Sequence, residues 1–207
     1  MNQELSTRIG QACLRMSREY RDDVSRSVAD LAILRRGLGR SPGDDLGSWS
    51  IVLRAAGDAL DAHGDEPSAS EWAAHTALTL FAFHQQGERG RSAHRQGPSM
   101  GAACRELVGS TARVRQTTAA EAEDGIRRRF HALGTATSIT ELAHHARSIV
   151  GLLRSSDISL DYARLTEDLE RWQRPTSAAS VRLRWGRDFY RLPSDESTPN
   201  SAEGATS

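Results

Sequence analysis

The sequence predicts an all-α protein that consists of two small helical bundles joined by a basic loop. First, apolar side chains recur every three or four residues in most segments, which places them on one face of a helix. Second, three segments begin with Ser or Thr followed three residues later by Glu, the spacing of a helix capping box. Third, the connections are short, and only residues 181–185 alternate as a strand does. That run fits a short final helix equally well.

The helical segments follow one another with few interruptions. Apolar residues from Val24 to Leu34 form one stripe, Gly37 is the expected stop, and residues 38–47 form a loop. Further helices are expected near residues 49–60, 68–83, 99–107, 118–133, 138–153 and 159–172. The capping pairs are Ser68 with Glu71, Thr118 with Glu121 and Ser138 with Glu141, and Ser99 is a further cap. Residues 113–117 form a polar connection, and Pro175 stops the helix that begins near Ser159.

A basic loop divides the chain. Residues 85–98 contain three Gly, three Arg and one Pro with almost nothing apolar, which predicts an exposed loop. We therefore expect an N-terminal helical bundle over residues 1–97 and a C-terminal helical bundle over residues 98–192. The polar residues 193–207 are expected to be a disordered tail.

The composition argues against several classes of protein. No apolar run is long enough for a membrane span and the N-terminus is polar, which indicates a soluble cytoplasmic protein. Cys13 and Cys104 stand alone, as small core residues do. Glu141 and His144 match half of a bundle di-iron motif, but no second half exists. We expect no catalytic set, no metal and no cofactor, and therefore no enzyme.

Arginine is the most informative residue type. The 27 basic residues balance 27 acidic ones, and all the basic residues are Arg. Helical i,i+4 partners are available to five of them, in Asp22–Arg26, Glu123–Arg127, Asp124–Arg128, Glu167–Arg171 and Glu170–Arg174. Arg184 and Arg187 share a single nearby acid, Asp188. Eight further arginines are expected to be bare, that is, to have no acid nearby; they are Arg35, Arg36, Arg40, Arg91, Arg95, Arg113, Arg115 and Arg182. A basic face without a base-reading motif predicts sequence-independent nucleic-acid binding, with an acidic protein partner as the alternative.

Six blocks of sequence also resemble the CasB family, the small subunit of the type I-E CRISPR surveillance complex Cascade. The blocks are LAILRRG (31–37), EWAAHTALTLFAFHQQ (71–86), SMGAACREL (99–107), RRRFHALGTATSITELAHHARSIVGLLR (127–154), LDYARLTEDLERWQ (160–173) and VRLRWGRDFYR (181–191). They occur in the family's order, and the resemblance covers about residues 24–191. The resemblance implies an all-α subunit of two bundles, without catalytic activity or metal, present in two copies. It implies contacts with guide RNA, target DNA and the Cascade subunits CasA and CasC.

The resemblance also implies a set of nucleic-acid-binding residues. Basic positions of the family correspond to three blocks here, and the bare basic loop adds Arg91 and Arg95. The three blocks are Arg35 and Arg36; Arg127 and Arg128; and Arg182, Arg184 and Arg187. Such a surface would hold the displaced DNA strand and stabilise the R-loop in antiviral defence. The alternative is an assembly scaffold whose arginines face partner subunits rather than DNA.

Overall fold

A computed structural model describes residues 3–61, 64–115 and 119–191, and all their side chains except those of 114–115 and 119–123. In these ranges the chain forms nine α-helices and one 3-10 turn, so the predicted all-α fold is confirmed. The elements are α1 (Gln3–Arg21), α2 (Ser25–Arg36), α3 (Leu46–Ala56), η1 (Gly57–Ala59), α4 (Ala69–His84), α5 (Met100–Arg115), α6 (Ala119–Thr135), α7 (Ile139–Ser155), α8 (Tyr162–Trp172) and α9 (Pro175–Tyr190). None of these helices is both long and apolar enough to cross a bilayer.

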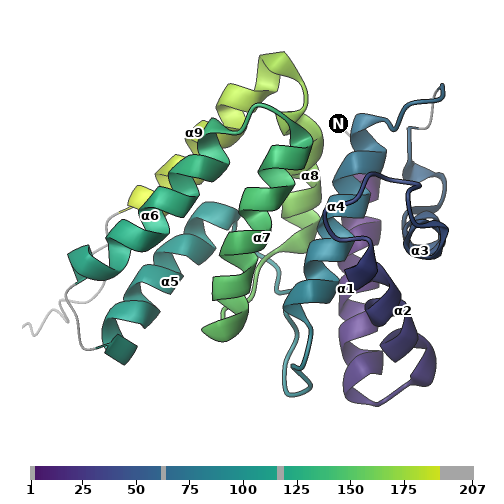
Figure 1. The fold of residues 1–207 in the computed structure, drawn as a ribbon, viewed down its shortest axis with the longest axis horizontal. Helices are drawn as coiled ribbons and strands as arrows, with labels where there is room; N and C mark the ends of the chain where they lie inside the picture. Colours follow the sequence, from purple (N-terminus) through teal and green to yellow (C-terminus); the bar gives the residue numbers. More distant parts are fainter. Residues whose placement is uncertain (1–2, 62–63, 116–118, 192–207) are drawn as a thin grey trace, which may run out of the picture.

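The helices α1, α2 and α3 lie at one end of the molecule, and α5, α6 and α9 lie at the other (Figure 1). Helix α4 lies between them, and its residues 73–82 are buried throughout because other helices surround it. Helix α8 comes late in the sequence yet packs against α1 and α4 as well as α9. A boundary at residue 97 therefore does not separate all helix contacts, and the division into two bundles stays a prediction.

The helix starts agree closely with the predicted caps. Ser68 and Glu71 form a complete capping box. The Ser99 hydroxyl accepts a hydrogen bond from the Ala102 amide at 3.2 Å, as expected of a cap. At Ser138 only half of the box forms, because the Glu141 carboxylate accepts from the Thr137 amide at 2.7 Å instead of from Ser138. The pair Thr118–Glu121 lies outside the described side chains.

Some predicted boundaries differ from the structure. Residues 181–185 belong to α9, so the helical alternative for this run is correct and the strand-like one is wrong. Helix α8 ends at Trp172, before Pro175 as expected, and Pro175 then begins α9 at its first turn, where the missing amide hydrogen costs nothing. Helix α8 begins at Tyr162 because the Asp161 carboxylate caps it by accepting from the Arg164 amide at 3.1 Å. Helix α5 continues to Arg115, beyond the expected start of a polar connection at 113.

The basic loop of residues 85–98 is less exposed than predicted. Gln85, Ala93 and His94 are buried. The Gln85 amide group bonds inward on both sides: its oxygen accepts from the Ala93 amide at 2.9 Å, and its nitrogen donates to the Glu88 and Arg91 carbonyls at 2.6 and 2.9 Å. The Leu160 amide then donates to the Ala93 carbonyl at 3.0 Å. Hydrogen bonds within the loop therefore fix its conformation, and the bond from Leu160 attaches it to the segment that leads into α8.

Gly101 permits the close packing of α5 on α9. A Cβ atom at this position would lie 2.0 Å from the Trp185 carbonyl oxygen and 3.1 Å from the Phe189 nitrogen, both of which are backbone atoms. Gly101→Ala must therefore push the two helices apart. We expect it to lower the free energy of unfolding by about 3 kcal/mol, the upper end of the usual cost of overpacking, as measured by urea unfolding.

Gly109→Ala is the matched control on the same helix. Apart from the adjacent backbone of α5 itself, no atom of the described residues lies within 4 Å of a Cβ at position 109. Because Ala favours a helix more than Gly does, the variant should gain up to about 1 kcal/mol. Equal effects of the two substitutions would contradict the close approach of α5 and α9 at Gly101.

Candidate nucleic-acid interface

Helix α9 carries three of the predicted arginines, Arg182, Arg184 and Arg187. Val181, Trp185 and Phe189 recur every four residues and are buried, so they fix which way the helix faces. Arg182 and Arg187 are exposed on the remaining surface. Neither side chain forms an ion pair or hydrogen bond with another described residue, which leaves both guanidinium groups available to an external anion.

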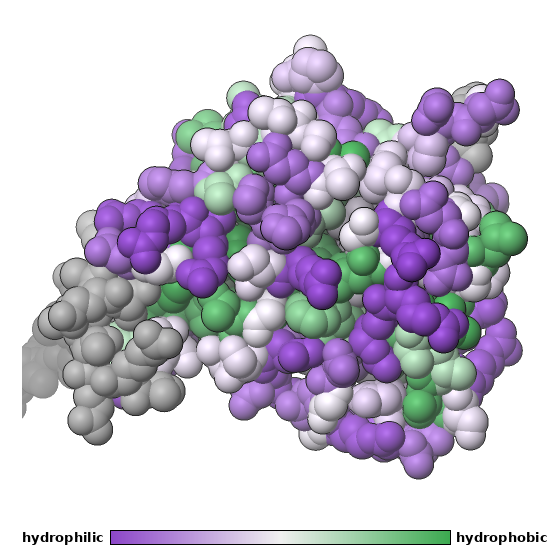
Figure 2. Space-filling model, in the orientation of Figure 1, coloured by the Kyte–Doolittle hydropathy of each residue, from purple (hydrophilic) through white to green (hydrophobic). Residues whose placement is uncertain are grey.

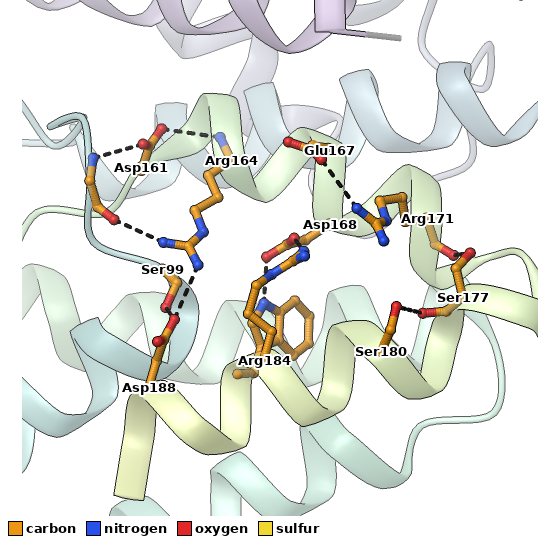
Figure 3. Close-up of polar contacts among 12 residues, drawn as sticks. Ser99, Asp161, Arg164, Glu167, Asp168, Arg171, Ser177, Ser180, Arg184 and Asp188 are labelled. Atoms are coloured by element: carbon orange, nitrogen blue, oxygen red, sulfur yellow. Dashed lines mark hydrogen bonds and ion pairs between the residues drawn. The ribbon is translucent and has the colours of Figure 1, made fainter. Parts of the chain in front are cut away.

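Arg184 has a different environment from its neighbours. Its guanidinium forms an ion pair with Asp168 of α8, a carboxylate whose residue is 1% exposed (Figure 3). The Trp185 indole nitrogen donates to the other Asp168 oxygen at 2.5 Å. Burial raises the pKa of Asp168, and the bonds from Trp185 and Arg184 partly oppose that effect. The expectation that Arg184 has only Asp188 as a partner is therefore wrong, and its main contact joins α8 to α9.

Asp188 is likewise occupied by partners other than those expected. It accepts from the Ser99 hydroxyl at 2.5 Å and forms an ion pair with Arg164 at 3.2 Å (Figure 3). Arg164 also donates to the Gly97 carbonyl at 3.2 Å. Arg105 of α5 donates to the Asp188 carbonyl at 2.7 Å. These bonds tie the C-terminal end of α9 to α5, α8 and the basic loop, so that end is held firmly.

The two arginines of the basic loop also have acidic partners. Arg91 lies 3.0 Å from Asp157 and 3.5 Å from Glu88, and its residue is half-buried. Arg95 lies 3.6 Å from Glu106 and is exposed. The expectation that both lack an acid is wrong, because the fold brings Asp157 and Glu106 to the loop from elsewhere in the chain.

Helix α6 presents the next basic block. Arg127 forms an ion pair at 2.6 Å with Asp124, three residues earlier in the helix. The structure therefore pairs Asp124 with Arg127 and not with Arg128, the predicted partner. Arg128 is exposed and its side chain forms no bond with another described residue. Figure 2 shows hydrophilic side chains over α6 and hydrophobic surface in the hollow between α6 and α5. That hollow, of about 550 Å³, is lined by Ile126 and Leu107 together with Arg128 and Arg129.

Helices α6 and α9 contact each other directly. The rings of Phe130 and Phe189 stack with centroids 4.6 Å apart. The His131 Nε2 atom and the Tyr190 hydroxyl lie 2.8 Å apart, within hydrogen-bond distance. The exposed arginines of these helices are therefore carried by neighbouring elements of one end of the molecule.

The first basic block is remote from the other two. Arg35 and Arg36 end α2, and α2 lies at the opposite end of the molecule from α6 and α9 (Figure 1). Arg36 is exposed, whereas Arg35 is half-buried and its Nη1 atom is buried without a described hydrogen-bond partner. The nine predicted residues therefore do not form one continuous face.

Other predicted contacts can be compared with the geometry. The pairs Glu167–Arg171 and Glu170–Arg174 are confirmed at 3.5 and 2.7 Å. Glu141 lies 3.7 Å from His145 and accepts hydrogen bonds from Thr137. Across the part of the chain that the structure describes, no three His, Cys, Asp or Glu side chains gather in a metal-binding arrangement.

Comparisons with known proteins agree with one another. A family model described as CRISPR-associated protein Cse2 matches residues 30–190. The structure of CasB from Thermobifida fusca is 34% identical, with a TM-score of 0.73, over 90% of this chain and 97% of that one. CasB from M. ruber is 26% identical, with a TM-score of 0.61, over 88% of this chain and 93% of that one. CasB from Thermus thermophilus, at 23% identity and a TM-score of 0.62 over 88% and 98%, shares the fold. A search of curated proteins gave no match.

The family model covers most of the chain, and a relative of known structure aligns over nearly the whole of both proteins. The fold, the order of the blocks and both comparisons lead to the same assignment. The chain belongs to the Cse2 (CasB) family of CRISPR-associated proteins.

Proposed function

We propose that this chain is a non-catalytic small subunit of a type I-E Cascade that binds nucleic acid through exposed arginines and stabilises the R-loop. The observation that carries the proposal is the pair Arg182 and Arg187 on the outer surface of α9, exposed and unpaired among the described residues. Arg128 is exposed as well, on α6, which contacts α9 through Phe130 and Phe189. The ligands are the displaced DNA strand and the guide–target duplex. CasA, CasC and a second copy of the subunit are the protein partners.

Backbone contacts alone are sufficient for this task. Forming an RNA–DNA duplex in place of a DNA duplex is nearly balanced in free energy, so a few phosphate contacts to the displaced strand shift the equilibrium. Guide–target pairing supplies the sequence specificity, and the protein therefore needs no base-reading motif. Arginine suits the role because its guanidinium can meet two phosphate oxygens at once.

The other predicted arginines are ranked by their partners. Arg91, Arg95, Arg127 and Arg184 each lie beside a carboxylate, so a phosphate would have to compete with that acid. Arg35 and Arg36 remain candidates for a separate contact at the other end of the molecule. We therefore assign the largest share of binding to Arg128, Arg182 and Arg187.

The double variant Arg182→Ala/Arg187→Ala tests the assignment. Each phosphate contact on single-stranded DNA contributes about 0.7 to the slope of log affinity against log salt concentration. We expect the variant to bind a labelled single strand more weakly and to lower that slope by about 1.4 in a fluorescence titration. Arg174→Ala is the matched control, since Arg174 is exposed at the start of the same helix but paired with Glu170 at 2.7 Å. An unchanged affinity and slope in the double variant would refute the assignment.

One observation favours the alternative of an assembly scaffold. Leu183 lies between the two arginine positions in sequence, and it is 54% exposed. An exposed apolar side chain among arginines is typical of a protein interface. On this alternative the same double variant would fail to join the complex while binding DNA as the parent does.

A further inference from the structure

One groove of the described surface is lined by none of the three arginines to which most of the binding is assigned, Arg128, Arg182 and Arg187. It has a volume of about 1080 Å³ and runs between α5, residues 95–98 and the C-terminal end of α9. Its lining combines arginines with the aromatic residues Phe189 and Tyr190. Neither the predicted basic blocks nor the proposed function accounts for these aromatic residues.

The groove is strongly basic. Four arginines line it against one acid, Glu106; they are Arg95, Arg105, Arg113 and Arg191. Glu106 lies 3.6 Å from Arg95 and so neutralises at most one of them. Arg113 and Arg191 are exposed and form no ion pair with another described residue. The charge of this lining therefore favours an anionic occupant with more than one phosphate or carboxylate.

One arginine of the groove is already oriented. Arg105 is half-buried, and its Nη1 atom donates to the Asp188 carbonyl oxygen at 2.7 Å. Because a carbonyl is neutral, this bond fixes the side chain without cancelling its charge. The rest of the guanidinium can still donate to a phosphate oxygen.

Tyr190 provides a rigid aromatic surface at the same place. The residue is 51% exposed. Its edge-to-face contact with Phe189, at 4.7 Å and 85°, supports it on one side. The Tyr190 hydroxyl lies 2.8 Å from His131 Nε2, which restrains the ring further. A fixed and half-exposed ring beside phosphate-binding groups is the arrangement on which an unpaired base stacks.

We infer that this groove binds a short unpaired stretch of nucleic acid, with a base stacked on Tyr190 and the flanking phosphates held by Arg105, Arg113 and Arg191. The inference rests on the proposed function, and it adds a second nucleic-acid-binding site to the one formed by Arg128, Arg182 and Arg187. A paired duplex does not fit the requirement, because its bases are stacked inside the helix and cannot cover the ring. An acidic protein segment would satisfy the charges but would gain nothing specific from Tyr190.

The test uses the full chain and a single-stranded oligonucleotide that contains 2-aminopurine, whose fluorescence falls when it stacks. Tyr190→Ala should reduce both the quenching and the affinity, by about 5-fold to 140-fold, the equivalent of about 1–3 kcal/mol of stacking per base. Tyr190→Phe, which keeps the ring, should retain both. For an oligonucleotide with abasic sites, which keeps the phosphates, Tyr190→Ala should have the same affinity as the parent.

The outcomes separate this inference from the proposed function. If Arg182→Ala/Arg187→Ala weakens binding but Tyr190→Ala does not, the groove inference is overturned and the proposed function stands. If Tyr190→Ala alone weakens binding, the groove is supported and the assignment of the α9 arginines falls. If a polyglutamate peptide of equal charge displaces the oligonucleotide and Tyr190→Ala has no effect, the groove is a docking site for acidic protein and the inference is overturned.

Discussion

The free energy of unfolding is expected to fall by about 5 kcal/mol as the pH drops from about 6.5 to about 4. Two buried imidazoles cause this loss. His75 and His84 are 2% and 1% exposed, and burial lowers the pKa of each from 6.5 to about 4. Each shift is equivalent to about 3 kcal/mol, since one pKa unit corresponds to about 1.36 kcal/mol.

The sign follows from which state binds protons first. Below pH 6.5 the unfolded chain protonates both histidines while the folded chain keeps them neutral, so acid favours unfolding. His94 acts in the same direction because burial lowers its pKa as well. Asp168 opposes them, since its raised pKa lets the folded state take up a proton. The destabilisation by His75, His84 and His94 exceeds the stabilisation by Asp168, so the folded state loses stability in acid.

Urea unfolding at several pH values between 7.5 and 4.5 measures the effect. The parent slope near pH 5.5 should approach about 2.7 kcal/mol per pH unit, which corresponds to two protons. His84→Asn keeps a polar group opposite the Tyr162 hydroxyl, which lies 3.0 Å from His84 Nδ1. It should lower the slope by about 1.4 kcal/mol per pH unit. A parent whose stability is flat over this range would contradict the account.

Asp168→Ala is expected to lower the free energy of unfolding by about 2–3 kcal/mol, because it leaves the buried Trp185 indole without an acceptor and the half-buried Arg184 without its ion-pair partner. Asp168→Asn should cost less, since an amide oxygen can still accept from Trp185.

Glu167→Ala is the control for Asp168→Ala. Glu167 is the preceding residue on α8, is half-buried and forms an i,i+4 pair with Arg171 at 3.5 Å. Such pairs contribute only about 0.2–0.5 kcal/mol. Chemical unfolding should therefore distinguish the two variants clearly. A loss below about 1 kcal/mol for Asp168→Ala would mean that the contact between α8 and α9 does not depend on this carboxylate.

Local features of the fold could be read from the sequence. Capping at Ser68 and Ser99 depends on residues three positions apart, and such short-range signals survive in the structure. Helix α1 could have been predicted from another short-range signal, the helical spacing of apolar residues. Leu5, Ile9, Cys13 and Met16 recur at that spacing and are buried. Residues 181–185 stayed ambiguous because five residues fit either period.

Long-range contacts could not be read in the same way. Asp157 meets Arg91 from 66 residues away, and Ser99 meets Asp188 from 89 residues away. No local pattern encodes such pairs, so arginines that seemed bare in the sequence have partners in the fold. For the same reason the groove at Tyr190 is invisible in the sequence, because α5 and α9 form it only after folding.

The most direct test of the central claim is photo-crosslinking in a complex reconstituted with its protein partners, guide RNA and target DNA. A photoreactive benzoylphenylalanine would replace Arg187, which leaves Arg182 in place, and a control would carry it at the exposed Gln11 of α1. Position 187 is predicted to crosslink to nucleic acid, with displaced DNA as the main product, and position 11 is not. Crosslinks from position 187 to protein subunits alone would contradict the account and establish the α9 surface as a protein interface.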